Sequence, residues 1–288
     1  MKLLRFKAGE GARLGVVKGD GIVDLSGLGA DFGSIQDVIA GGQAALDRIN
    51  DHRERSATSL ETASATLLAP LRPGKYMAIG MNYQQHAEEA EKLGVATPKQ
   101  QFWFNKQTTC ISGPFDAIDP GVTEKLDYEV ELAVVVGPTA RYVSEQDAPA
   151  HIFGYTVAND VSARDWQFHS PTFTIGKSFD THGPIGPWIV TADEVADPHA
   201  LDLRCFVNGQ QRQHGNTAGL IHNIFAQIAY LSTAFTLEAG DLIATGTPHG
   251  VGVAMDPPTF LQPGDVVRCE IDGIGAIENR VAVPAPRT

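Results

Sequence analysis

Short strand-like runs separated by clear turns dominate this chain, and they do not alternate regularly with helices. Strand character is found at Tyr76–Gly80, Asp127–Val136, His151–Ala158, Pro187–Thr191, Arg204–Asn208, Asp241–Thr245, Val266–Asp272 and Ala276–Val283. Turn sequences such as Asn208-Gly209 and Pro263-Gly264-Asp265 separate them, and helices are expected at Tyr83–Lys92 and Ile221–Ala234. A doubly wound parallel sheet needs strands that alternate with helices. We therefore predict a mixed α+β fold that is mostly β and rolled rather than doubly wound.

The first 70 residues are predicted to form a small α+β domain. Two strand-like runs flank the turn Gly19-Asp20-Gly21, and Ser34 begins a short helix with a capping-box spacing. Prolines from Pro70 to Pro73 then indicate a boundary. We expect a small N-terminal domain at residues 1–70 and a larger domain at residues 71–288.

Composition and charge exclude several classes of protein. The 288 residues include 34 acidic and 22 basic side chains, and the net charge of -12 argues against binding nucleic acid or anionic membranes. No apolar run reaches the length of a membrane span, and the N-terminus lacks a signal-peptide pattern. Three widely spaced cysteines without a CxxC pair indicate reduced thiols. We expect a cytoplasmic enzyme with no nucleic-acid or membrane partner.

Two glutamates in the run Asp127–Val136 are the first candidate functional residues. Alternate side chains of a strand share a face, so Glu129 and Glu131 point the same way, and this face continues with the apolar Ala133 and Val135. Their Cα atoms would be about 6.6 Å apart, close enough for both carboxylates to reach one ion. A solvated strand face is the alternative. Partial burial would require a cation or the protonation of one carboxylate.

Asp160 supplies a third carboxylate at the end of an apolar run. An aspartate at such a junction commonly caps the next helix, and this alternative stays open. Together with Glu129 and Glu131 it would form an all-oxygen ligand set suited to Mg²⁺ or Mn²⁺. The residue types therefore favour a divalent metal site.

Three common motifs are incomplete in this chain. Gly176-Lys177-Ser178 looks like the end of a phosphate-binding loop, but Pro171 stands where that loop has its first glycine. The same segment fails as a nucleophile elbow because Asp180 replaces the final glycine. Gly273–Glu278 lacks the third glycine of a dinucleotide-binding fingerprint. We therefore exclude these three sites.

Five motifs occur in the order in which they occur in the fumarylacetoacetate hydrolase family. They are the segments Ile79–Glu89, Asp127–Ala133, Asn159–Gln167, Gly176–Thr181 and Ala244–Pro248. From about residue 70 to the C-terminus the chain resembles this family, and its first 70 residues resemble, more weakly, the small leading domain of bacterial members. The resemblance implies a β-roll, barrel-like catalytic domain and a homodimer.

The resemblance also implies metal ligands and an acid–base pair. Glu129, Glu131 and Asp160 would bind one divalent ion, usually magnesium. His86 and Glu89 would form the dyad that activates water, and their spacing of three residues makes them neighbours on a helix. An exposed helix histidine is the alternative for His86.

Three more residues match positions near the metal and the substrate. Lys177 matches the family's active-site lysine, whose charge would stabilise an enolate, and an ordinary loop lysine is its alternative. Arg164 and Gln167 match positions near the metal and the substrate. A structural ion pair with Asp127 or Asp165 is an equal alternative for Arg164.

Thr247 and two histidines complete the candidates. Thr247 matches a residue that contacts the substrate carboxylate, and turn capping is its alternative. His182 departs from the family pattern, and His169 lies on the segment that is expected to border the pocket. Each is either a substrate contact or a surface histidine.

The resemblance implies a metal-dependent hydrolase that acts on a small keto acid. It would cleave a C–C bond in a 2,4-diketo acid, an acylpyruvate-like compound, to give pyruvate and a carboxylic acid. Oxaloacetate decarboxylation, dioate isomerisation and ureidoglycolate cleavage are alternatives within the family. A non-catalytic protein whose metal only stabilises the β fold is the alternative from another class.

Overall fold

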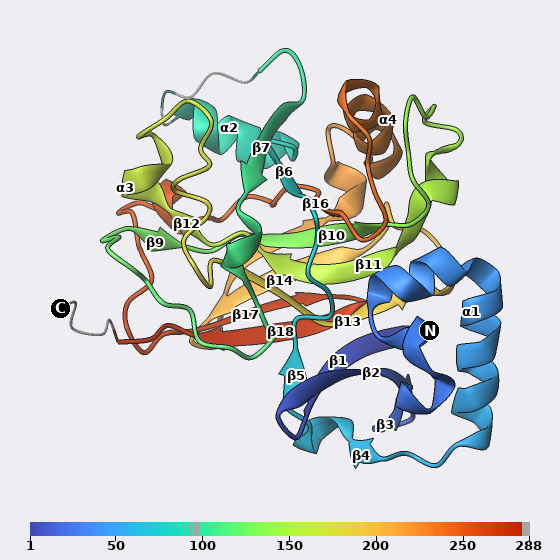
Figure 1. Cartoon of the computed structure of the whole chain (residues 1–288). Coiled ribbons are helices and arrows are strands. Elements are labelled where there is room, and N and C mark those ends of the chain that lie inside the picture. Colours follow the sequence, from blue (N-terminus) through green and yellow to red (C-terminus); the bar gives the residue numbers. More distant parts are fainter. Residues whose placement is uncertain (93, 95–97, 284–288) are drawn as a thin grey trace.

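A large mixed sheet runs through the computed structural model, which describes residues 1–92, 94 and 98–283 (Figure 1). Its strand order is β4-β3-β2-β1-β13-β11-β10-β16-β6-β7, with β5 paired to β1 and β8 to β13. In chain order the strands are β1 (Lys2–Ala8), β2 (Gly11–Lys18), β3 (Gly21–Asp24), β4 (Leu60–Glu61), β5 (Leu67–Leu68), β6 (Tyr76–Gly80), β7 (Phe102–Lys106), β8 (Ile111–Ser112), β10 (Val130–Val136), β11 (Ile152–Asn159), β13 (Gly183–Thr191) and β16 (Leu242–Ala244).

Two smaller sheets, four α-helices and several short 3₁₀ helices complete the described part of the chain. A four-stranded sheet has the order β15-β14-β17-β18, and β9 pairs with β12. These strands are β9 (Leu126–Asp127), β12 (Ser162–Ala163), β14 (Asp202–Val207), β15 (Gln210–Asn216), β17 (Val266–Ile271) and β18 (Gly275–Arg280). The helices are α1 (Ile35–Arg55), α2 (Gln84–Lys92), α3 (Arg164–Gln167) and α4 (Ile224–Ala234). None of these helices is long and apolar enough to cross a membrane.

The two faces of β10 pack into different hydrophobic cores, as the alternation in the sequence predicts. Val130, Leu132, Val134 and Val136 belong to a core shared with β14, β17 and α4. Ala133 and Val135, on the opposite face, pack with residues of α1, β6 and β13. The face that begins with Glu129 and Glu131 is therefore buried, and the solvated-face alternative is wrong.

The N-terminal strands extend the large sheet rather than forming a sheet of their own. β1 pairs antiparallel with β13 through Lys2↔Val190 and Leu3↔Ile189. The Ser34 hydroxyl accepts a hydrogen bond from the Asp37 amide, so the predicted cap is confirmed. The helix that follows is 21 residues long rather than short, because the chain resumes helical geometry after Gly42. The boundary at residues 70 and 71 stays a prediction.

Three strands of more than two residues have no counterpart in the sequence prediction, and one predicted strand is interrupted. β1, β7 and β15 are the additional strands. The predicted strand Asp127–Val136 is divided into β9 and β10, with Tyr128 and Glu129 between them. At this break the Asn159 side chain replaces a backbone partner, because its Oδ1 accepts the Glu129 amide at 3.0 Å.

Candidate active site

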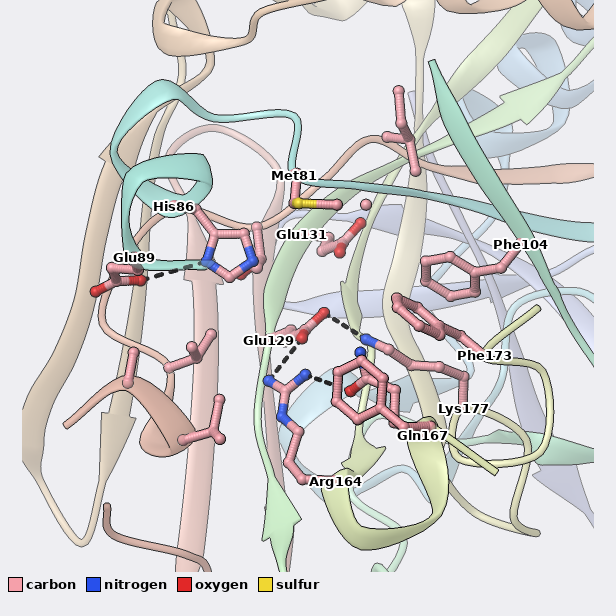
Figure 2. A pocket seen from close by; sticks show the side chains of 17 residues that line it. Met81, His86, Glu89, Phe104, Glu129, Glu131, Arg164, Gln167, Phe173 and Lys177 are labelled. Carbon is pink, nitrogen blue, oxygen red and sulfur yellow. Dashed lines mark hydrogen bonds and ion pairs between the residues drawn. The ribbon is translucent and has the colours of Figure 1, made fainter. Parts of the chain in front are cut away.

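Most of the predicted site residues surround one cavity of about 210 Å³ at the end of β10 where α2 and α3 lie. Eight of the nine line it: His86, Glu89, Glu129, Glu131, Arg164, Gln167, Lys177 and Thr247. The ninth, Asp160, is fully buried and contacts Lys177, which lines the cavity. Five segments that are distant in the sequence therefore meet here (Figure 2).

Glu129, Glu131 and Asp160 form a compact cluster of carboxylates. One ligand atom from each lies within 4.8 Å of the others, and all three side chains are buried. The Asp160 amide donates to the Glu129 carbonyl oxygen, so the end of β11 is fixed beside the start of β10. Asp160 caps no helix, because α3 begins four residues later. The geometry and the hard oxygen donors fit one divalent cation.

Basic side chains balance part of the cluster's charge. Lys177 Nζ lies 2.7 Å from Glu129 Oε2 and 2.8 Å from Asp160 Oδ2. Arg164 Nη2 lies 2.7 Å from Glu129 Oε1. Burial alone would raise the pKa of Glu129, but Lys177 and Arg164 hold it well below its usual value.

Glu131 carries the charge that is least well balanced. Its Oε2 accepts the Gly246 amide at 2.8 Å. Burial, together with repulsion from Asp160 and Glu129, raises the pKa of Glu131 well above the usual value. The three carboxylates are close enough to bind one ion, and Glu131 has no ion-pair partner in the described residues. This arrangement favours the binding of an added cation.

Lys106 is a site residue that the sequence prediction missed. It lies on β7, its side chain is fully buried, and its Nζ contacts Asp160 Oδ1 and the His182 carbonyl oxygen. Although burial disfavours its charge, Asp160 keeps the pKa of Lys106 above the usual value. The available signal was Phe102, Phe104 and Lys106 at alternate positions, which places the lysine on the face of two aromatic residues.

The dyad predicted on α2 forms. His86 Nδ1 lies 3.3 Å from Glu89 Oε2, and the two side chains are only 15% and 20% exposed. The Gly250 amide donates to both Glu89 oxygens, at 3.0 and 3.2 Å, and so fixes the carboxylate. His86 is therefore not an exposed helix histidine, and it faces the cavity that contains the acids.

Arg164 forms the ion pair with Asp127 and also reaches the site. Its Nε donates to Asp127 Oδ2 at 2.9 Å, and its Nη1 donates to Gln167 Oε1 at 2.9 Å. The two alternatives for Arg164 are thus combined in one side chain. Asp165 does not take part, because it accepts hydrogen bonds from Thr123 and Glu124 instead.

Gly176 allows the segment with Lys177 to approach α3. A Cβ atom at this position would lie 2.4 Å from the backbone of Gln167 and 2.8 Å from the Ala163 carbonyl oxygen. The Ala163 amide donates to the Gly176 carbonyl oxygen at 2.8 Å. Gly176, which suggested a phosphate-binding loop, therefore allows its segment to pack closely against the backbone of Ala163 and Gln167. This packing holds Lys177 beside the acids.

Thr247 lines the cavity, but its hydroxyl is already engaged with protein atoms. Its Oγ1 donates to the Val130 carbonyl oxygen at 2.9 Å and accepts from Gln213 Nε2 at 2.8 Å. Gln213 also accepts the Val130 amide. A substrate contact by Thr247 stays a prediction. Gln213 was missed because β15 is a polar edge strand without apolar alternation.

Neither additional histidine lines the cavity. His169 is exposed and its ring packs on Trp166. His182 is fully buried, stacks on Phe179, and its Nε2 lies 2.9 Å from the Asp119 carbonyl oxygen. Burial, with a smaller contribution from the Lys106 charge, lowers the pKa of His182 to about 3.

We expect His182 to make the stability of the protein depend on pH. The unfolded ring titrates near about 6.5, so between that pH and about 3 the unfolded chain binds more protons than the folded one. The contribution of His182 is therefore complete above about pH 6.5 and is lost as the pH falls. Urea unfolding at pH 7 and pH 5 should show a smaller loss for His182→Gln than for wild type. His214→Gln, at an exposed position, is the control, and equal losses in all three proteins would contradict the assignment.

Apolar side chains form the remaining walls of the cavity. Phe104, Phe168 and Phe173 lie on one wall, and the Phe173 ring packs against both other rings. Val251 and Val253 also line the cavity. Figure 2 shows Phe104 and Phe173 on the far side of the acids from His86. The cavity therefore has charged side chains on one side and apolar side chains on the other.

Comparisons with known proteins show which family the chain is similar to. The family model for the C-terminal domain of fumarylacetoacetate hydrolase matches residues 75–282. The mitochondrial oxaloacetate tautomerase fahd2 of Xenopus laevis is 41% identical over 290 residues, which cover 98% of this chain and 90% of that protein.

Solved structures show the same fold. Fumarylacetoacetate hydrolase of Exiguobacterium antarcticum has a TM-score of 0.82 and 36% identity, with 98% of this chain and 99% of that chain covered. Maleylpyruvate hydrolase of Sphingobium sp. SYK-6, solved with manganese(II) and pyruvate, has a TM-score of 0.83 and 33% identity, covering 99% and 100%. The predicted fold class, mostly β with a catalytic domain of this type, is confirmed.

Proposed function

The chain belongs to the fumarylacetoacetate hydrolase family, and from this premise we propose that it is a divalent-metal-dependent hydrolase of 2,4-diketo acids. The reaction cleaves the bond between C3 and C4 of an acylpyruvate-like compound and releases pyruvate and a carboxylic acid. One observation carries the proposal: the carboxylate cluster and the His86–Glu89 dyad open onto the same cavity.

Glu129, Glu131 and Asp160 would hold the metal ion, Mg²⁺ or Mn²⁺. Support comes from the separation of their ligand atoms, from their burial and from the incomplete balance of their charge. When bound, the ion would supply Lewis-acid polarisation of the 2-oxo-carboxylate end of the substrate. Manganese(II) and pyruvate in the Sphingobium hydrolase are in line with this choice.

His86 would act as base and then as acid. Glu89 engages Nδ1, which leaves Nε2 to take a proton from the attacking water. The water oxygen bonds to C4, the C3–C4 bond breaks, and its electron pair remains on the pyruvate fragment as an enolate. The ammonium of Lys177 would stabilise that charge. The proton on Nε2 is then transferred to C3, which gives pyruvate.

The walls of the cavity favour an apolar group at the distal end of the substrate. Among the described lining residues, the two strong cations, Arg164 and Lys177, are already paired with Glu129. A second carboxylate would therefore lack a free positive partner. An alkyl or aryl group would instead displace water from the aromatic wall and from Val251.

His86→Gln tests the role of the dyad. Loss of a positioned general base costs roughly 10²- to 10⁴-fold in rate, so we expect kcat for acylpyruvate hydrolysis to fall by that range while the KM changes little. The assay would follow acylpyruvate absorbance in the presence of Mg²⁺. His169→Gln, an exposed histidine outside the cavity, is the matched control and should keep wild-type kinetics.

Two results would overturn the hydrolase proposal. One is a wild-type protein that turns over another 2-oxo acid but no acylpyruvate. The other is full hydrolysis by the His86→Gln protein. Oxaloacetate and ureidoglycolate in the same panel would identify decarboxylation or lyase activity.

Oxaloacetate tautomerisation is the second candidate, and sequence similarity favours it. The Xenopus tautomerase covers nearly the whole chain at 41% identity. Moving a proton between C3 and the 2-oxygen needs an acid–base group beside a stabilised enolate, which is the same chemistry without an attacking water. Rapid loss of enol-oxaloacetate absorbance, dependent on His86 and without release of CO₂, would support this candidate over hydrolysis.

The assembly and the location of the protein stay predictions. The family resemblance suggests a homodimer, and the composition suggests a cytoplasmic protein. The similar Xenopus protein is named as mitochondrial. A small keto acid is the partner that the cavity supports.

A further inference from the structure

Asp127 is a fully buried carboxylate with partners on two different segments. Its Oδ2 accepts the Arg164 Nε at 2.9 Å. On the other side, Oδ1 accepts the Gly252 amide at 2.8 Å and Oδ2 accepts the Val253 amide at 3.0 Å. The Asp127 side chain has an exposed fraction of 0%. It therefore joins α3 to the segment from residue 250 to residue 253, which we call the 250–253 loop.

The 250–253 loop also holds the dyad. The Gly250 amide donates to both oxygens of Glu89, and Glu89 in turn lies beside His86 Nδ1. The Gly250 carbonyl oxygen accepts the Tyr128 hydroxyl at 3.2 Å. Two amides of this loop are thus bound by Asp127, and a third binds the carboxylate of the dyad.

Close packing leaves the loop little freedom to shift by itself. A Cβ atom at Gly252 would lie 2.2 Å from the Thr259 carbonyl oxygen and 2.7 Å from Asp127 Oδ1. The Thr259 amide donates to the Gly252 carbonyl oxygen. A change at Asp127 should therefore move the loop as a unit, including the amide that holds Glu89.

We propose that Asp127 is a positioning residue that aligns the two halves of the active site with each other: it orients Arg164 against Glu129 directly, and it orients Glu89 and His86 through the 250–253 loop. This inference rests on the proposed function, because it assigns a catalytic task to both halves. Asp127 itself does not line the cavity.

The first test replaces Asp127 with asparagine. The amide is isosteric, but Oδ1 of Asp127 accepts the Tyr128 and Gly252 amides, and Oδ2 accepts Arg164 and the Val253 amide. The NH₂ group of asparagine must therefore face two N–H donors, and the loop loses an acceptor in either orientation. Loss of such supporting contacts typically costs about 10- to 100-fold in activity, and we expect this in kcat. Asp165→Asn is the matched control, since the Asp165 side chain also accepts a backbone amide but bonds neither to the Arg164 guanidinium nor to the loop.

Double variants separate positioning from a general loss of structure. If Asp127 acts through both routes, Asp127→Asn should lower kcat clearly less in a Glu89→Gln or an Arg164→Lys background than in the wild type. If Asp127→Asn lowers kcat as much in the Glu89→Gln background as in the wild type, Asp127 does not act through the loop, and the proposal is wrong. Loss only in the fraction of folded protein, with kcat per folded molecule unchanged, would also overturn it.

Hydrogen exchange tests the linkage without any substrate. Asp127→Asn should speed exchange of the Gly250 amide, which Asp127 does not contact, as well as of the Gly252 and Val253 amides. Unchanged Gly250 exchange would contradict the proposal. Should Asp127→Asn fail to fold, Tyr128→Phe loosens the same loop at the Gly250 carbonyl, and it should lower kcat with little change in KM. If the wild type turns over no 2-oxo acid, the proposed function fails, whereas the exchange result still decides the linkage.

Discussion

Replacing Glu131 with glutamine is expected to reduce activity by roughly a thousandfold. Lewis-acid assistance is worth several kcal/mol of transition-state stabilisation, and each 1.36 kcal/mol is about tenfold in rate. Glutamine can still accept the Gly246 amide, but it removes one anionic ligand from the cluster. Calorimetric titration with Mn²⁺ should show much weaker binding, and chelation of the wild type with EDTA should reproduce the loss of activity.

The stability of the Glu131→Gln protein distinguishes lost metal binding from misfolding. Removing the charge relieves the repulsion from Asp160 and Glu129, so without metal the variant should unfold at the same urea concentration as the wild type or a higher one. Glu278→Gln, an exposed carboxylate on β18, is the control and should leave activity and metal affinity unchanged. Wild-type activity in Glu131→Gln, or wild-type activity that persists in EDTA, would contradict the metal assignment.

Lys106→Met is expected to have the largest effect on stability. Breaking a buried ion pair by removing one partner costs about 3–5 kcal/mol. Both the Lys106 and the Asp160 side chains have exposed fractions of 0%, and Asp160 would retain only Lys177 as a described cationic partner. The free energy of unfolding from urea titration should fall by this amount at neutral pH.

An exposed ion pair provides the comparison for Lys106→Met. Arg13 is 52% exposed and lies 2.8 Å from Asp24, so Arg13→Met should cost less than about 1 kcal/mol. A loss at Lys106 as small as that at Arg13 would mean that Lys177 alone balances Asp160. Added Mn²⁺ should restore part of the stability lost in Lys106→Met, because the ion supplies positive charge to the same carboxylate.

Periodic or closely spaced signals predicted two parts of the site from the residues themselves, whereas Lys177, Arg164, Gln167 and Thr247 were predicted only from the family resemblance. Glu129 and Glu131 alternate with an apolar face, and both faces of β10 pack as that alternation requires. His86 and Glu89 are three residues apart on one helix and form the expected contact. These contacts follow from local geometry, which a sequence records directly.

The parts that could not be predicted depend on pairings between distant segments. Lys106 meets Asp160 across 54 positions of the chain, and a lysine at the end of an aromatic run does not reveal that its face is buried. Gln213 lies on a polar edge strand, where backbone pairing rather than apolar burial holds the strand in place. The sequence indicated Asp127 as one possible ion-pair partner of Arg164, but no pattern near Asp127 indicates its hydrogen bonds to the 250–253 loop.

The short ladder between β1 and β13 has a consequence for any shortened form of the protein. β13 pairs with β11 along one side, whereas Lys2 and Leu3 cover Val190 and Ile189 on the other. A fragment confined to residues 75–282, the span of the family model, would expose the edge of β13 at the buried residues Ile189 and Val190. An exposed edge strand of this kind can pair with a strand of another molecule and so cause aggregation. We therefore expect a fragment of residues 75–282 to aggregate more readily than the full chain, even if it keeps the whole active site.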